Sequence, residues 1–422
     1  MTITSEQPTV IVRMADAGDL YMSWRWIGNV YSQGASMLPE APITEAIRQL
    51  AGALPNPAEP DALERAMTTG AFASYDSEYL VAQALSRALL PYGLAAQLYD
   101  LHTRGVRPHI RLQPSPRLAQ VPWELIAPNP DLRLVDIADV SLLAPASIVH
   151  SAGRTARSWH ETRELPVVAI LDPRVPGFRA DSALGSVLGR MDAGTRLAHR
   201  VAEYCAQGRL LPAVDDPTEA FRRTDIDRGW LGEVLRQGAS RLTYVGHVTA
   251  AAPESGQSED AQLHLACGAD TIGFATPTRA HRPLSAKDLL LGTHTLDPEP
   301  LAGSQLWPIP SRVALIACES GGDLRFSEAL GLITAMISGG AELVTASRWP
   351  LPTDLAFQRL AGAPPDAHPL QDAICSIDTA HEQPDPIATL ADWQRKRLAA
   401  WRNARTIEHS PVLWAAFATV RT

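Results

Sequence analysis

Lysine and cysteine are scarce in this chain of 422 residues. Lysine occurs only at Lys287 and Lys396, so arginine supplies almost all of the positive charge. The 4 cysteines are far apart and form no Cys-x-x-Cys pair: Cys205, Cys267, Cys318 and Cys375. This spacing argues against a disulfide framework and favours reduced thiols in a reducing compartment. The nearest metal-like spacing, His264 with Cys267, has no second pair beside it, so no metal site is expected.

Other absences exclude whole classes of protein. No apolar run reaches the roughly 18 residues of a membrane span, and the N-terminal segment lacks the pattern of a signal peptide. A net charge of -9 argues against direct nucleic-acid binding, which normally uses a basic face. No glycine-rich phosphate loop is present, which argues against a nucleotide cofactor and against a small-molecule α/β enzyme that depends on one. We therefore expect a cytoplasmic protein without membrane contact and without a cofactor.

Strands alternate with helices from residue 165 onward. A strand at Leu165–Leu171, a helix at Met191–Gln207, a strand at Arg209–Val214 and a helix at Trp230–Gln237 predict a mostly parallel sheet with helices on both faces, an α/β/α sandwich. An apparent hairpin, 262–266 with 271–274, interrupts this alternation.

The N-terminal part has a different pattern. Two strands joined by a turn, Val10–Met14 and Asp19–Ile27, precede helical segments up to Thr103, which predicts an α+β region. We place domain boundaries so that 1–105 is this region, 106–160 an entry segment and linker, and 161–422 the α/β domain. A basic helix with tryptophans, Ala391–Arg405, either contacts a partner or presents a solvated face over the sheet.

The segment Arg312–Gly322 is the centre of the predicted site. Five apolar residues, Val313–Ala317, fit a strand buried on both faces, and Cys318 follows at its carboxyl end. Ligands of open α/β sheets bind at this edge, and Gly321 with Gly322 lets the chain turn there. Cys318 is therefore a candidate nucleophile, although free cysteines in general are more often inert core residues.

A second strand of the same type supplies a histidine. Leu242–Gly246 is a short β-rich run, and His247 follows it directly. If the two strands are neighbours, His247 and Cys318 end at the same edge, where the imidazole can take the thiol proton. The pair predicts a Cys/His dyad, with histidine before cysteine as in caspases.

These stretches resemble the CHAT domain, a caspase-like family related to separase within clan CD of the cysteine peptidases. The similarity is carried by five segments: Gln113–Ile126, Tyr244–His247, Ala317–Gly321, Ala329–Trp349 and His409–Phe417. The resemblance implies a caspase-like or separase-like fold and a peptide hydrolase with His247 and Cys318 as its dyad. It also implies that the backbone N–H groups of Cys318 and Val248 stabilise the oxyanion.

Substrate selection follows from the same resemblance. Separase-like relatives hold a basic P1 side chain with a carboxylate four residues beyond the tryptophan of this loop. Here the tryptophan is Trp349, and Asp354 lies five residues beyond it. We expect Asp354 to be the P1 partner, with Asp323 as a second candidate and helix capping as the alternative role of Asp354.

The resulting hypothesis is a cysteine endopeptidase that cleaves a specific protein substrate. Bacterial CHAT proteases act in antiviral defence and programmed death, and the scarcity of lysine is typical of GC-rich bacterial genomes. No sensor repeat occurs in the sequence, so we expect a separate activating or sensor protein. The alternative is a catalytically weak CHAT scaffold that binds a partner, because Val248 stands where the family usually has glycine and cannot readily adopt a positive φ.

Overall fold

The computed structural model describes residues 7–56, 59, 61–251, 257–293, 301–317 and 331–422. The chain divides into two compact units. The first comprises residues Met1–Leu143, Phe357–Pro365 and Asp385–Thr419, and the second comprises Ala144–Ala356, Asp366–Pro384 and Val420–Thr422. The first unit's longest continuous segment ends at Leu143, and two later segments return to this unit. The domain boundaries at 105 and 160 stay a prediction.

The first unit combines a mixed sheet with helices, as the N-terminal pattern predicts. Its strands follow the order β3-β2-β1-β4-β5-β14. Their bounds are β1 (Thr9–Ala17), β2 (Asp19–Trp26), β3 (Gly34–Leu38), β4 (His109–Gln113), β5 (Asp139–Leu143) and β14 (Phe417–Arg421), of which β14 ends in the second unit. The helices are α1 (Glu40–Ala53), α2 (Ala62–Thr68), α3 (Tyr75–Leu89), α4 (Tyr92–Thr103), α5 (Leu134–Ile137), α15 (Pro386–Ala404) and α16 (Pro411–Trp414).

The predicted hairpin is confirmed as the antiparallel pair β1 and β2. Residues of β2 alternate between buried and exposed, as expected for a sheet with one face on a core. Trp24 and Trp26 both lie on the buried face, and both indole N–H groups donate to the Gln97 side-chain oxygen, at 3.0 Å and 2.8 Å. Gln97 belongs to α4, so this helix packs on the inner face of the hairpin.

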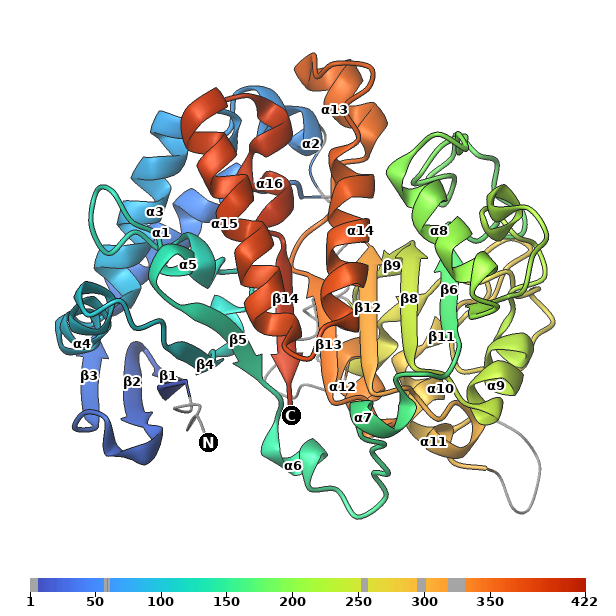
Figure 1. Ribbon diagram of the computed structural model, residues 1–422, viewed down its shortest axis with the longest axis horizontal. Helices are drawn as coiled ribbons and strands as arrows, with labels where there is room; N and C mark the ends of the chain where they lie inside the picture. The colour runs from blue at the N-terminus through green and yellow to red at the C-terminus, as the bar shows by residue number, and fades with distance from the viewer. Residues whose placement is uncertain (1–6, 57–58, 60, 252–256, 294–300, 318–330) are drawn as a thin grey trace. The chain divides into compact units, whose positions relative to one another are not determined.

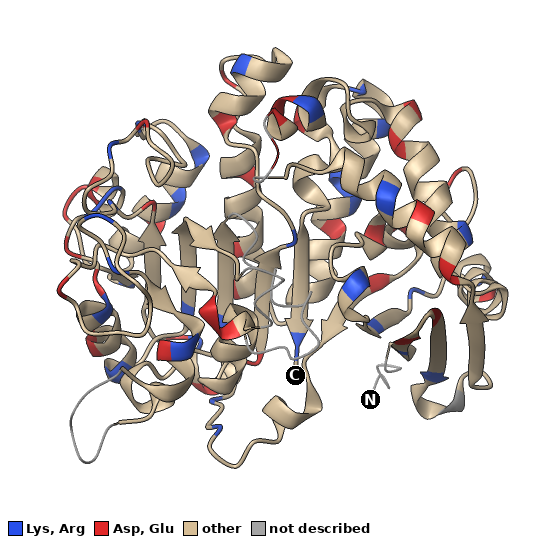
Figure 2. Ribbon diagram, turned by 180° about the vertical axis from the view of Figure 1, so that it is seen from behind, with Lys and Arg blue, Asp and Glu red and all other residues tan. Residues whose placement is uncertain are grey.

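The predicted basic helix is the C-terminal part of α15, and acidic residues of its own unit neutralise much of its charge. Arg402 pairs with Asp136 at 2.6 Å and Arg395 with Asp139 at 3.5 Å. Trp401 is fully buried. Figure 2 shows basic and acidic positions interspersed along the helices. These arginines therefore stabilise their own unit more than they offer a free basic surface.

The second unit confirms the predicted mostly parallel sheet, with strand order β13-β12-β8-β6-β7 and every pair parallel. The strands are β6 (Val167–Leu171), β7 (Leu210–Leu211), β8 (Arg241–Gly246), β12 (Arg312–Ala317) and β13 (Leu343–Ser347). All residues of β6, β8, β12 and β13 are buried, as expected for inner strands of a parallel sheet. Only β6 is apolar throughout, and β12 is apolar after Arg312. Strand β7 is shorter than predicted because Pro212 cannot donate a ladder hydrogen bond.

The second unit contains eight helices besides α13 among its described residues, and α8, α12 and α14 contact strands of this sheet. The eight are α6 (Ala146–Val149), α7 (Trp159–Thr162), α8 (Arg196–Ala206), α9 (Arg228–Gln237), α10 (Ala286–Leu291), α11 (Gly303–Leu306), α12 (Leu332–Ser338) and α14 (Pro369–Glu382). Helix α14 packs against α8 and against strands β8 and β12, in front of them in Figure 1. Helix α13 (Asp354–Ala361) contains residues of both units.

The predicted hairpin of residues 262–266 and 271–274 is wrong. Strand β10 (Gln262–Leu263) instead lies between β9 (Val248–Thr249) and β11 (Leu284–Ser285) in a small antiparallel sheet. Strand β9 continues directly from His247, so this small sheet carries the chain away from the edge of the larger one. Ser285 caps α10 as predicted, because its hydroxyl accepts from the Asp288 backbone N–H at 3.1 Å.

Among the helices of the described part of the chain, none is both long enough and apolar enough to span a membrane.

Candidate active site

Strands β8 and β12 are direct neighbours and run parallel. Their register pairs Gly246 with Ala317, the last residue of each strand. The carboxyl ends of both strands therefore meet at one edge of the sheet, as the dyad hypothesis requires. His247 is the next residue after β8. Cys318 and Asp323 lie outside the described residues, so the separation of imidazole and thiol stays a prediction.

His247 has a defined tautomer. Its Nε2 atom lies 3.0 Å from the carbonyl oxygen of Gly185. A carbonyl oxygen can only accept, so the proton sits on Nε2 and Nδ1 carries the lone pair that a base needs. Burial lowers the pKa of His247, and Arg222 lowers it further, whereas the Gly185 carbonyl and the Asp172 carboxylate raise it. The imidazole is thus neutral at pH 7, as a general base must be.

Asp172 is an acidic residue near His247 that sequence reasoning did not assign. It follows Leu171 at the carboxyl end of β6, the neighbour of β8, and is fully buried. Its carboxylate accepts four hydrogen bonds, from the Ser186 hydroxyl (2.5 Å), the backbone N–H groups of Val187 (3.1 Å) and Leu188 (3.3 Å), and the Arg222 guanidinium (3.3 Å). Asp172 therefore fixes the loop whose Gly185 carbonyl contacts His247.

The sequence signal for Asp172 is a carboxylate directly after a buried strand. It stands after Leu165–Leu171 as Cys318 stands after Val313–Ala317. Its φ of 53° places it in the left-handed region, which is uncommon for residues other than glycine and more accessible to aspartate than to most. The rule that led to the predicted dyad, a polar side chain at the carboxyl end of an inner strand, also selects Asp172.

Val248 adopts an extended conformation as the first residue of β9. Its register partner in β10 is Leu263. The N–H of His264 donates to the His247 carbonyl at 3.1 Å, so the pair 247 and 264 is the hydrogen-bonded one. Because such pairs alternate along an antiparallel ladder, the Val248 N–H points away from β10. An extended backbone suits a β-branched residue, so valine here needs none of the conformational freedom of glycine.

A buried network braces the main chain at His247. The Tyr244 hydroxyl lies 2.7 Å from the His247 carbonyl oxygen and 2.8 Å from that of His264. His264 Nδ1 lies 3.1 Å from His281 Nε2, and His264 Nε2 lies 2.9 Å from the Thr249 hydroxyl. Burial, assisted by His281 and His247, lowers the pKa of His264 to about 3. Burial lowers the pKa of His281 as well, so both histidines are neutral at pH 7. His264 is hydrogen-bonded to Thr249 of β9, and His281 holds the other side of the His264 ring.

Protons of this network can be assigned. His281 Nδ1 lies 2.9 Å from the Cys267 carbonyl oxygen, which only accepts, so the proton of His281 is on Nδ1. His281 Nε2 then accepts from His264 Nδ1, and His264 Nε2 accepts from Thr249. Both ring nitrogens of His264 therefore take part in hydrogen bonds. Cys267 takes part through its carbonyl, and among the described residues no cluster of three metal-ligating side chains occurs.

The residues expected to select the substrate are tightly packed. Trp349 follows β13 by two positions and is fully buried. The Asp354 carboxylate accepts from the Leu370 backbone N–H at 2.7 Å, at the start of α14. Burial raises the pKa of Asp354, against the opposing effect of hydrogen bonds from Leu370 and Gln371. A basic P1 side chain would have to share this carboxylate with α14, so the assignment of Asp354 to P1 stays a prediction.

The fold and the edge geometry define a mixed α/β protein with a mostly parallel sheet, in which a neutral histidine ends one inner strand beside the end of another. The model of the CHAT domain family matches residues 80–422. The chain therefore belongs to the CHAT family, which is caspase-like.

Two crystal structures of the Saccharomyces cerevisiae separase–securin complex are similar, with TM-scores of 0.46 and 0.43 and sequence identities of 9% and 10%. They cover 99% and 98% of this chain, which spans only 30% of the matched chain in each. No curated protein matches the chain.

Proposed function

We propose that this chain is a cysteine endopeptidase with Cys318 as nucleophile and His247 as general base. The observation that supports it most is the register of β8 and β12, which ends with Gly246 beside Ala317, one residue before each member of the pair. The lone pair on His247 Nδ1 supports it further. In the described residues the remaining thiols are poor nucleophiles, because burial raises the pKa of Cys205 and Cys267, and that of Cys375 to about 12.

The proposed reaction proceeds in two halves. The Cys318 thiol gives its proton to His247 Nδ1, and the thiolate forms a bond to the carbonyl carbon of the substrate peptide. The N–H groups of Cys318 and Val248 donate to the resulting oxyanion. The carbon–nitrogen bond then breaks, and the leaving amine takes the proton from His247. Water, deprotonated by His247, hydrolyses the thioester and restores the thiol.

The physiological setting belongs to the same proposal. We propose a specific protein substrate, cleaved after a basic residue held by Asp354, in a bacterial defence or programmed-death pathway of the cytoplasm. A separate protein would trigger the activity. Family membership supports this setting, and the alternative within the same family is a catalytically weak scaffold that binds a partner protein.

A thiol-reactive peptide probe with a basic P1 residue tests the catalytic proposal. Wild type should be labelled at Cys318, and Cys318→Ala and His247→Ala should both lose labelling. Cys205→Ala is the matched control, because Cys205 is a half-buried thiol elsewhere in the same unit, and it should label as wild type does. Labelling that survives His247→Ala would contradict the dyad. No labelling even with the activating partner present would favour the scaffold.

A further inference from the structure

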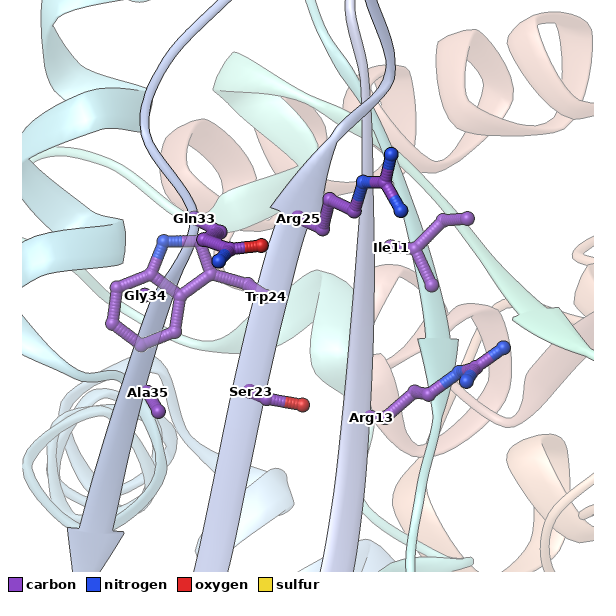
Figure 3. Close-up of a pocket in the computed structure, with 8 residues that line it drawn as sticks. All are labelled: Ile11, Arg13, Ser23, Trp24, Arg25, Gln33, Gly34 and Ala35. Carbon is purple, nitrogen blue, oxygen red and sulfur yellow. The ribbon is translucent and has the colours of Figure 1, made fainter. Parts of the chain in front are cut away.

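The outer face of the first unit's hairpin carries a hollow that the proposed chemistry does not use. Strands β1 and β2 bury one set of alternating residues, whereas the other set, which includes Ile11, Arg13, Ser23 and Arg25, faces outward. Together with Gln33 to Ala35 these residues line a cavity of about 630 Å³. Figure 3 shows both guanidinium groups on the same side of the two strands.

The two arginines of this face are not neutralised within the described part of the chain. Neither Arg13 nor Arg25 forms an ion pair there, although both are exposed and the chain carries a net charge of -9. Asp19 belongs to the same outward set of β2, and its carboxylate accepts a hydrogen bond from the Glu40 backbone N–H at 3.0 Å. This contrasts with α15, where acidic residues of the same unit pair with the arginines. Among the described residues, this face therefore carries two arginines that no carboxylate pairs with.

The spacing of the charges suits an extended ligand. Ile11 lies directly opposite Arg25, and Arg13 lies opposite Ser23, so the two arginines are diagonal neighbours. The backbone positions of diagonal neighbours are typically about 7 to 8 Å apart. Side chains on one face of an extended chain repeat about every 6.6 to 6.8 Å. Two carboxylates two residues apart on an extended segment can thus meet both guanidinium groups at once.

The next row of the face is apolar. Tyr21 lies opposite Met37 of the edge strand β3, and the two side chains are 51% and 53% exposed. They line a second hollow that shares Arg13 and Ser23 with the first. A ligand with two acidic side chains would therefore extend naturally toward an apolar or aromatic residue two positions further along. Exposed aromatic and methionine side chains are enriched in protein interfaces.

We propose that this outer face of β1, β2 and β3 is a docking site for an acidic, extended segment of a partner protein. The segment carries carboxylates at alternate positions, bound by Arg13 and Arg25, followed by an apolar side chain on Tyr21 and Met37. A nucleic acid fits less well, because the exposed Tyr21 and Met37 beside the arginines offer no charge to phosphates and the chain as a whole is acidic. The proposal does not depend on the chemistry of Cys318.

Fluorescence anisotropy with the full chain tests the proposal. The probe is a labelled peptide of about twelve residues with glutamates at alternate positions followed by tyrosine. We expect saturable binding that weakens at high salt. The double variant Arg13→Gln, Arg25→Gln should bind about tenfold more weakly or worse. Arg87→Gln, at an exposed arginine of α3 in the same unit, is the matched control and should bind as wild type does.

Further measurements separate the other occupants. Tyr21→Ser should weaken binding of the tyrosine-containing peptide but not of one that ends in serine. The proposal fails if the peptide does not saturate, if the double variant binds it equally well, or if a single-stranded oligonucleotide of equal charge binds the face more tightly. It also fails if sedimentation shows self-association that the double variant abolishes, because the face would then bind a second copy.

Discussion

At the scale of single residues, the site depends on how Asp172 holds the loop that contacts His247. We expect Asp172→Asn to slow probe labelling at neutral pH by about tenfold or more, because a small misplacement of a catalytic group can cost up to about 100-fold in rate. The Asp172 carboxylate raises the pKa of His247. Its loss lowers that pKa, so the acid limb of the labelling profile should move to lower pH. Measured labelling rates between pH 4 and 8 would show both effects.

The control for this variant is Asp181→Asn. Asp181 lies in the same loop region but is 77% exposed, and its ion pair is with Arg179. It should leave both the rate and the profile unchanged. A rate loss in Asp172→Asn without any shift of the acid limb would mean that Asp172 acts only on loop structure and not on the charge of His247.

Sequence reasoning reaches some residues of the candidate site and misses others. The position of His247 at the end of β8 is predictable because the strand before it is recognisable by composition. Its support is not, because Gly185 contributes a backbone carbonyl, and any residue type supplies one. The conformation of Val248 is likewise set by pairing with Leu263 across a loop, which no local pattern reveals.

At the scale of elements, the end of β8 has no room for a side chain. A Cβ on Gly246 would lie 2.7 Å from the Tyr244 hydroxyl and 3.2 Å from Pro173. Gly246→Ala should therefore displace Tyr244 from the His247 carbonyl and destabilise the protein by about 1 to 3 kcal/mol, the usual cost of overpacking. Gly153→Ala, where nothing lies within 4 Å, is the control in denaturant unfolding. Equal stability of the two variants would contradict this account.

Asp354 links two helices, and its two roles can be separated. Asp354→Ala should cost about 1 kcal/mol of unfolding free energy because α14 loses a capping acceptor, whereas Asp354→Asn should cost little. If the carboxylate also binds a basic P1 residue, both variants lose the preference for basic probes over neutral ones. Denaturant unfolding and paired probes measure the two effects. An Asn variant that keeps the preference would remove Asp354 from P1.

Long elements were predictable from the sequence, and short ones were not. The buried strands β6 and β12 contain runs of five apolar residues, and β8 is rich in residues that favour strands, so the sequence displays all three directly. Strands of two residues such as β10 and β11 have no periodic signal. Their pairing depends on residues brought together by the loop after His247, and a nearby segment was mistaken for the partner.

At the scale of the whole molecule, each unit is built from segments that lie far apart in the sequence. Residues 385–419 return to the first unit after the second has been built. Composition changes along the chain mark linkers, but they carry no information about a helix that returns to an earlier unit. The family match that begins at residue 80 likewise crosses the division between the units.

The stability of the molecule should depend on pH through its buried neutral histidines. His381 of α14 is almost fully buried, and its Nε2 lies 2.8 Å from the Thr345 hydroxyl. Burial, with Arg241 and Arg312 nearby, lowers its pKa from 6.5 to about 3. Between these values the unfolded chain binds a proton that the folded chain does not, so stability is complete above pH 6.5 and is lost as the pH falls toward 3.

The pH dependence of stability that His381 causes is large enough to measure, and one substitution tests it. At pH 5 the loss is about 2 kcal/mol from His381, since each pKa unit is worth about 1.4 kcal/mol. His264 adds to the same pH dependence, because its pKa is also about 3.

In His381→Gln the amide can keep a hydrogen bond to Thr345 but cannot titrate, so the change in unfolding free energy between pH 7 and 5 should shrink by about 2 kcal/mol. His150→Gln, at an exposed histidine, controls for the loss of an imidazole. A slope in His381→Gln equal to that of wild type would mean that His381 is charged in the folded protein, and the buried network around Thr345 would then have to accommodate an imidazolium.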